Sequence, residues 1–142
     1  MATVKADVAK KQTEDMQAKL MPVSLGGRVR IAKGSFTGAG EAAGTIVQLV
    51  KLPAGARVLS TSKIAFDAGQ NASLTVKVGD EVNDARYLAS GTVGASAVTK
   101  ALEANILGDY VLEKEMFLIM TTGGAALTAA KKITFEIYYV ID

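Results

Sequence analysis

The sequence predicts an all-β protein, an antiparallel jelly-roll-like β-sandwich of about eight strands with an N-terminal arm or short helix. From Arg28 onward, apolar residues recur at about every second position, which is typical of strands with one buried face. Clusters of Gly, Asn and Asp bound these segments, and no helical segment of about 10–15 residues separates them, which disfavours a βαβ layout. The 142 residues suit one domain without disulfides, so we divide the chain into an arm, residues 1–26, and a single sandwich domain, residues 27–142.

The expected strands follow one another with short connections. Val29 and Ile31 alternate with Arg28 and Arg30 in the first strand, and the last strand places Phe135 on one face and Glu136 and Tyr138 on the other. The segment 101–107 is ambiguous between a strand end and a helical turn. The expected strands lie at or within residues 28–32, 45–52, 58–66, 74–78, 86–89, 98–107, 116–122 and 133–141.

The first 20 residues differ from the rest because they contain neither Gly nor aromatic residues and are rich in Lys, Gln and acidic residues. Their apolar residues recur at multiples of four, which predicts a loose stripe along one side of a helix. Burying four such side chains yields roughly 6–12 kcal/mol, whereas fixing about 20 residues costs roughly 20–40 kcal/mol. This segment is therefore either a solvated, frayed terminus or an arm held chiefly by a partner, and its deletion should leave the sandwich folded. The candidate contact residues of the arm are Val4, Lys5, Val8, Lys10, Lys11, Met16, Lys19 and Leu20.

Three strands, in residues 46–50, 117–120 and 137–141, carry more apolar residues than a sheet with one wet face requires. We therefore expect some outer faces to be covered, by the arm or by another subunit. Three segments rich in Gly and Ala, residues 34–44, 89–97 and 121–130, are expected to be loops that either admit a partner's backbone or are simply flexible. Phe36 and Tyr138 complete the predicted partner-contact residues.

The composition excludes several kinds of chemistry. The chain has no Cys, His or Trp, so thiolate and imidazole catalysis, structural zinc and haem ligation are not available. We therefore expect no enzymatic activity, no cofactor and no metal. A net charge of +2 is too small for a protein that mainly neutralises nucleic acid, and no apolar run is long enough to span a membrane.

Two motifs have more than one interpretation. The pattern Gly38-Ala-Gly-Glu-Ala-Ala-Gly44 superficially resembles a dinucleotide-binding glycine motif, but a strand rather than a helix is expected to follow it. The acidic turn at residues 80–84 contains four side chains with oxygen ligands, Asp80, Glu81, Asn83 and Asp84, and is either an ordinary hairpin turn or a site for a hard cation such as calcium.

Three segments carry a resemblance to a known family. Residues 45–58, Thr-Ile-Val-Gln-Leu-Val-Lys-Leu-Pro-Ala-Gly-Ala-Arg-Val, are followed by Thr-Val-Lys-Val-Gly-Asp at 75–80 and Asp-Ala-Arg-Tyr-Leu at 84–88. Together they resemble small virion proteins of tailed bacteriophages, in particular head decoration or cement proteins. The resemblance spans about 50 of the 142 residues and does not include the arm or the Gly/Ala-rich loops.

The resemblance implies a jelly-roll protein on the outer surface of an icosahedral capsid, made in the cytoplasm of a bacterial host. It implies that the protein bridges subunits of the major capsid protein and is itself a homo-oligomer, a dimer or trimer, without catalytic residues. Another virion component, from the tail, neck or head fibre, is the main alternative. A soluble ligand-binding β-module is a second alternative.

Overall fold

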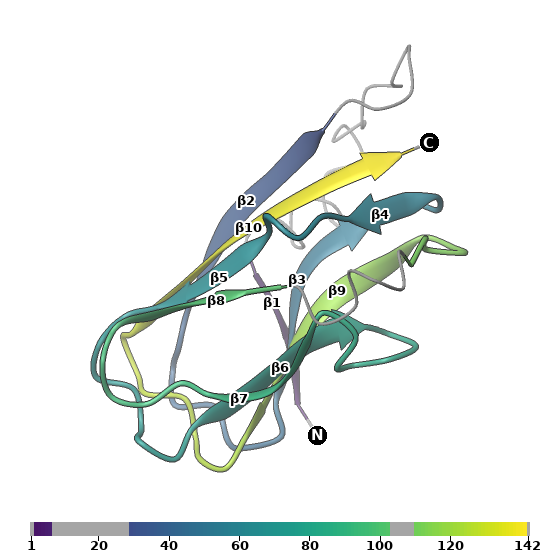
Figure 1. Ribbon diagram of the computed structural model, residues 1–142. Coiled ribbons are helices and arrows are strands. Elements are labelled where there is room, and N and C mark those ends of the chain that lie inside the picture. Colours follow the sequence, from purple (N-terminus) through teal and green to yellow (C-terminus); the bar gives the residue numbers. More distant parts are fainter. Residues whose placement is uncertain (1, 7–28, 103–109, 142) are drawn as a thin grey trace.

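The computed structural model describes residues 2–6, 29–102 and 110–141, which form ten β-strands (Figure 1). All regular elements within these residues are strands. Their bounds are β1 Thr3–Lys5, β2 Arg30–Thr37, β3 Ile46–Leu52, β4 Ala56–Val58, β5 Lys63–Phe66, β6 Thr75–Asp80, β7 Leu88–Thr92, β8 Val98–Ala101, β9 Met116–Gly123 and β10 Lys132–Ile141.

The strands form two sheets that pack as a sandwich. The β9 sheet has the order β1-β3-β9-β6-β7, and the β10 sheet has the order β2-β10-β5-β8, with β4 also paired to β10. Antiparallel pairs are nested along the chain, β2 with β10, β3 with β9, β5 with β8 and β6 with β7, and they alternate between the two sheets. The chain is therefore one long hairpin rolled into a barrel-like sandwich, and the predicted jelly-roll fold is confirmed.

The core lies between the two sheets and follows the period-two pattern of the sequence. In β10 the side chains of Ile133, Phe135 and Ile137 are fully buried and Tyr139 is nearly so. In β9 the side chains of Met116, Leu118 and Met120 face the same core. The expected strand at residues 58–66 is divided into β4 and β5.

The apolar excess in β3 arises from a β-bulge rather than from a covered outer face. Its register with β9 shifts between Gln48 and Val50, so that Leu49 is the extra residue of the strand. Leu49 and Val50 are both buried, although an unbroken strand would point them to opposite faces.

In β9 the excess has a different cause, because Ile119 faces outward yet is only 7% exposed. Ile119 pairs with Gly79 of β6, and the turn that follows folds back over this point. A Cβ atom on Gly79 would lie 2.1 Å from the backbone oxygen of Asn83, and Glu81 accepts a hydrogen bond from the Phe117 amide at 2.8 Å. The chain's own 80–86 turn therefore provides the cover that we expected from the arm or another subunit.

The N-terminal residues form a strand rather than the expected helix. Thr3–Lys5 pair in parallel with Ile46, Val47 and Gln48, and the ladder is extended at both ends by the backbone bonds Ile46 N to Ala2 O, 3.0 Å, and Ala6 N to Gln48 O, 2.8 Å. Val4 packs against the core opposite Val47, and Ala6 is buried. Residues 2–6 thus form an edge strand of the β9 sheet (Figure 1), and whether a partner also holds the arm stays a prediction.

The three segments expected to be loops are partly strand. β2 continues to Thr37, β7 includes residues 88–92, and β9 extends to Gly123. These Gly, Ala, Ser and Thr residues have small side chains, but the neighbouring strand supplies backbone hydrogen bonds that override their weak strand propensity. The ambiguous segment is a strand up to Ala101, and residues 103–109 lie outside the described residues.

We predict that Gly79→Ala destabilises the fold by about 1–3 kcal/mol. The added methyl group would overlap the backbone of Asn83 and Asp84 and would have to push the 80–86 turn off the sheet. Denaturant unfolding measures the free energy of unfolding. Gly91→Ala in β7 is the matched control, because its Cβ would meet its nearest neighbour only at 3.8 Å. Equal stability of the two variants would contradict the packing described for the turn.

Candidate interaction surfaces

The acidic turn at residues 80–86 is organised by a buried ion pair. The Asp80 carboxylate is fully buried, and its Oδ1 accepts hydrogen bonds from the backbone amides of Val82, 2.9 Å, and Asn83, 2.8 Å. Its Oδ2 accepts a hydrogen bond from Arg86 Nε at 2.6 Å. Because these donors engage both oxygens, the hairpin-turn interpretation is favoured over a cation site. The described residues contain no group of three acidic, His or Cys side chains that could hold a metal ion.

Aromatic side chains hold the same ion pair in place. The Arg86 guanidinium lies over the ring of Tyr110, 3.5 Å from its centroid, which is a cation–π contact. The adjacent Tyr87 is buried, and this burial, followed by the nearby Asp80 carboxylate, raises the pKa of its phenol above the usual value. Tyr87 therefore packs as part of the core beside the ion pair.

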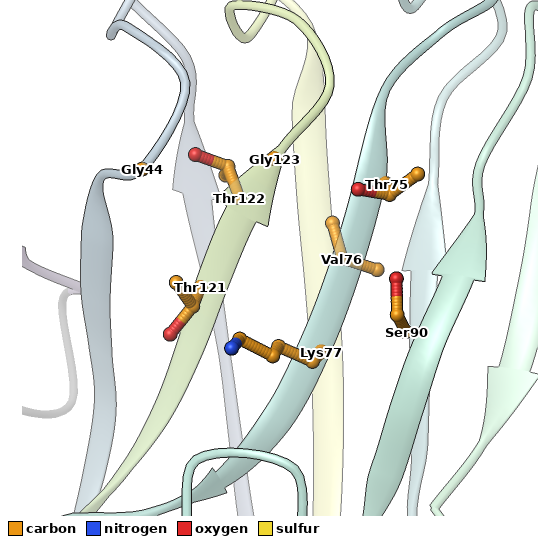
Figure 2. Close-up of a pocket in the computed structure, with 8 residues that line it drawn as sticks. All are labelled: Gly44, Thr75, Val76, Lys77, Ser90, Thr121, Thr122 and Gly123. Atoms are coloured by element: carbon orange, nitrogen blue, oxygen red, sulfur yellow. The ribbon is translucent and has the colours of Figure 1, made fainter.

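A first surface depression, the β9 pocket, lies at one end of the β9 sheet and has a volume of about 360 Å³ (Figure 2). Lys77 extends from β6 toward Thr121 on β9, its neighbour in register. The lining residues are Gly44, Thr75, Val76, Lys77, Ser90, Thr121, Thr122 and Gly123. Lys77 provides the one ionisable side chain among them, and its ammonium lies 2.8 Å from an Asp84 carboxylate oxygen. The pocket therefore offers hydroxyl groups but no free charge for an anion and no acid–base pair.

A second depression, the β10 groove, lies on the outer face of the β10 sheet and has a volume of about 500 Å³. Its lining residues are Val29, Leu59, Thr61, Lys63, Glu136 and Tyr138. Val29 is 54% exposed, and Ile31, the neighbour of Tyr138 in register, is 60% exposed. Exposed large apolar residues gathered on one face are typical of a protein contact surface.

Polar groups border this apolar centre and fix its shape. Lys33 forms an ion pair with Glu136 at 3.2 Å, and the Tyr138 hydroxyl donates to Glu136 Oε2 at 3.2 Å. Ser62 holds the backbone of Tyr138 through two hydrogen bonds. The Ser62 Oγ accepts a hydrogen bond from the Tyr138 amide at 2.8 Å and donates one to the Tyr138 carbonyl at 3.2 Å. An apolar centre with a polar rim is the usual organisation of a protein–protein interface.

The structure separates the predicted contact residues. Tyr138 lines the β10 groove, whereas Phe36 faces inward beside Ile133 and packs against the core. Val4 and Lys5 lie in β1, with Val4 against the core. The other candidates, Val8, Lys10, Lys11, Met16, Lys19 and Leu20, lie outside the described residues.

Sequence reasoning missed the exposure of Val29 and Ile31. Their alternation with arginine predicts a strand correctly, but the structure turns this apolar side outward and turns Ala32 and Phe36 toward the core. Alternation fixes which residues share a face and does not say which face is buried. No local pattern in the sequence identifies them, because the register that places Ile31 beside Tyr138 is a tertiary contact.

Comparison with solved structures identifies similar folds in bacteriophage capsids. The chain resembles one in the capsid of Ralstonia phage GP4, with a TM-score of 0.75, 19% identity and coverage of 99% of both chains. A chain of the cyanophage Pam1 capsid asymmetric unit matches with a TM-score of 0.60 and 22% identity, over 89% of this chain and 95% of that chain. A chain of the acid-stable capsid of Helicobacter pylori bacteriophage KHP30 matches with a TM-score of 0.55 and 19% identity, over 82% and 90% of the two chains.

Searches by sequence add no relative, since no family model and no curated protein matches the chain. At identities below 25%, the structural matches establish the fold. Among the residues that the structure describes, there is also no helix of the length and apolarity needed to cross a bilayer.

We predict that Arg86→Met destabilises the protein by about 3–5 kcal/mol, because it leaves the buried Asp80 carboxylate without its charged partner. Lys77→Met, which breaks the more exposed pair with Asp84, should cost at most about 1 kcal/mol. The double variant Asp80→Asn/Arg86→Met should recover part of the loss, since it removes the unpaired charge. Denaturant unfolding of the three variants checks the order, and equal losses for Arg86→Met and Lys77→Met would contradict it.

Proposed function

We propose that this chain is a bacteriophage head protein that decorates the outer surface of the capsid and stabilises it by bridging subunits of the major capsid protein. The observation that carries the proposal is the full-length similarity to a chain of a phage capsid, with 99% of both chains covered. The resemblance of residues 45–58, 75–80 and 84–88 to head decoration proteins supports the same function independently of the fold.

The residues of the structure suit a structural role. The buried ion pair of Asp80 and Arg86 serves the fold, and the β9 pocket holds no free charge or acid–base pair. In this proposal the protein is not an enzyme, needs no cofactor, and does not bind nucleic acid or membranes directly. It is made in the host cytoplasm, becomes part of the virion surface, and acts as a homo-oligomer, a dimer or trimer.

The β10 groove is the surface that we propose meets the major capsid protein. Val29 and Ile31 expose apolar area next to Tyr138, and the ion pair of Lys33 with Glu136 borders this area. A contact that removes the two aliphatic side chains from water gains free energy in proportion to the buried area. Binding that occurs only on the assembled shell shifts the equilibrium toward the shell by mass action.

Particles that lack the protein should assemble but should lose their DNA at a lower temperature than complete particles. Release of DNA on heating, followed by a fluorescent dye, measures this difference, and adding back the purified protein should restore it. Heat resistance equal to that of complete particles would contradict the cement function. Failure to form any shell would show instead that the chain builds the shell.

The number of copies in each purified particle distinguishes the proposed function from its main alternative. A protein that covers the head surface should be present in roughly hundreds of copies, and quantitative mass spectrometry of purified virions measures this number. A dozen copies or fewer would identify a tail or neck component.

Ile31→Glu should weaken binding to undecorated particles at least about tenfold, because a carboxylate would replace an exposed apolar side chain beside Tyr138 of the groove. Val82→Glu is the matched control, since Val82 is 66% exposed on the 80–86 turn, away from the β10 groove. Co-sedimentation with particles measures both affinities. Both variants should keep the unfolding transition of the parent protein, and equal affinities would show that the groove is not the contact surface.

A further inference from the structure

The outer edge of β3 is a slot that accepts one short segment of chain. β3 pairs with β9 on one side, and its other side is occupied over residues 46–48 by β1. The fit is specific in register, because Val4 lies opposite Val47 on the core side and Ala6, a small residue, is buried at the end of the ladder. A strand edge of this kind pairs readily with another chain when it is left open.

β1 is a separable unit. Among the described strands it pairs with β3 alone, over three residues, and its one large apolar side chain, Val4, is only partly buried. Elements with few buried contacts open more often than the rest of a fold. β1 can therefore leave β3 while the eight strands of the jelly roll stay paired.

The connection from β1 to β2 is long enough to reach another copy. Residues 7–28 separate Ala6 from Val29, and a chain of 22 residues can span at most roughly 75 Å. A domain of this length has a radius of gyration of roughly 14 Å and thus a diameter of roughly 37 Å. The covalent link therefore permits β1 to occupy the slot of its own chain or that of an adjacent copy.

We propose that this protein exchanges its N-terminal strand, so that residues 2–6 of one copy pair with β3 of a second copy when copies are held close together. The same ladder and the same core contacts form in both arrangements. Local concentration therefore decides between them, and covalent attachment through 22 residues corresponds to an effective concentration roughly in the millimolar range. Copies packed side by side reach a comparable concentration. Exchange ties neighbours together without any new surface.

The inference rests on the homo-oligomer part of the proposed function but not on capsid binding, and purified protein alone tests it. The chain has no Cys, so introduced thiols have no background. Two single variants are prepared, Thr3→Cys and Ile46→Cys, because Thr3 of β1 and Ile46 of β3 are paired in register. The two variants are unfolded together, refolded as a mixture and oxidised. A disulfide between the two variants then requires β1 of one chain to lie on β3 of another, since paired positions meet the distance that a disulfide needs.

At about 1 mM, we expect the mixture of Thr3→Cys with Ile46→Cys to give severalfold more disulfide-linked dimer than a control mixture of Thr3→Cys with Thr37→Cys. Thr37 stands on the other sheet and does not pair with β1. At about 10 µM the excess should disappear, whereas one chain carrying both Thr3→Cys and Ile46→Cys should cross-link within itself. Excess peptide of residues 1–8 should reduce the disulfide between chains. If Ile46→Cys does not fold, Lys5→Cys with Gln48→Cys provides a second pair in register.

A yield no higher than the control at about 1 mM would overturn the proposal. It would do so even if size-exclusion chromatography showed a dimer or trimer, because the copies would then associate through another surface. Such a result would leave the proposed function intact. Conversely, a protein that exchanges its strand but does not bind capsids would support the strand exchange and contradict the proposed function.

Discussion

The pairing of β10 with β2 is the interaction on which the rest of the structure depends. It joins Arg30 to Tyr139 and so connects residues more than a hundred positions apart. β10 has β2 on one side and β4 and β5 on the other, and its inward side chains, Ile133, Phe135 and Ile137, form the centre of the core. Once these ends of the chain are aligned, the pairs β3–β9, β5–β8 and β6–β7 follow in nested order. Such long-range pairing costs loop entropy, which the buried core must offset.

Most of the fold could be predicted from the sequence because the period-two pattern of apolar residues is a direct consequence of strand geometry. It located the eight main strands and the inner face of β10. It missed β1, because Val4 also fits a spacing of four with later apolar residues and the pairing with Val47 is a tertiary contact. It also misinterpreted the surplus of apolar residues in β3 and β9. A bulge at Leu49 and a turn folded over Ile119 depend on register and loop path, which no local pattern encodes.

The surfaces were less predictable than the fold. Two aromatic residues that looked equivalent in the sequence differ in the structure, since Tyr138 lines the β10 groove and Phe36 packs against the core. The acidic turn could be interpreted either as a cation site or as a structural hairpin. The decisive fact is that Arg86 reaches back to Asp80, six residues earlier, and that Tyr110 from another part of the chain covers it. Contacts of this kind form only when the chain has folded.

The antiparallel arrangement of β2 and β10 also determines how the domain responds to mechanical force. The start of β2 lies beside the end of β10, so a pull on these two ends separates the strands from one end. Hydrogen bonds in an antiparallel ladder are perpendicular to the strands, and such a pull breaks them one after another. A force that slides neighbouring strands along each other must break the whole row together. The domain should therefore resist a force that shears the strands of a sheet more strongly than one that pulls the start of β2 away from the end of β10.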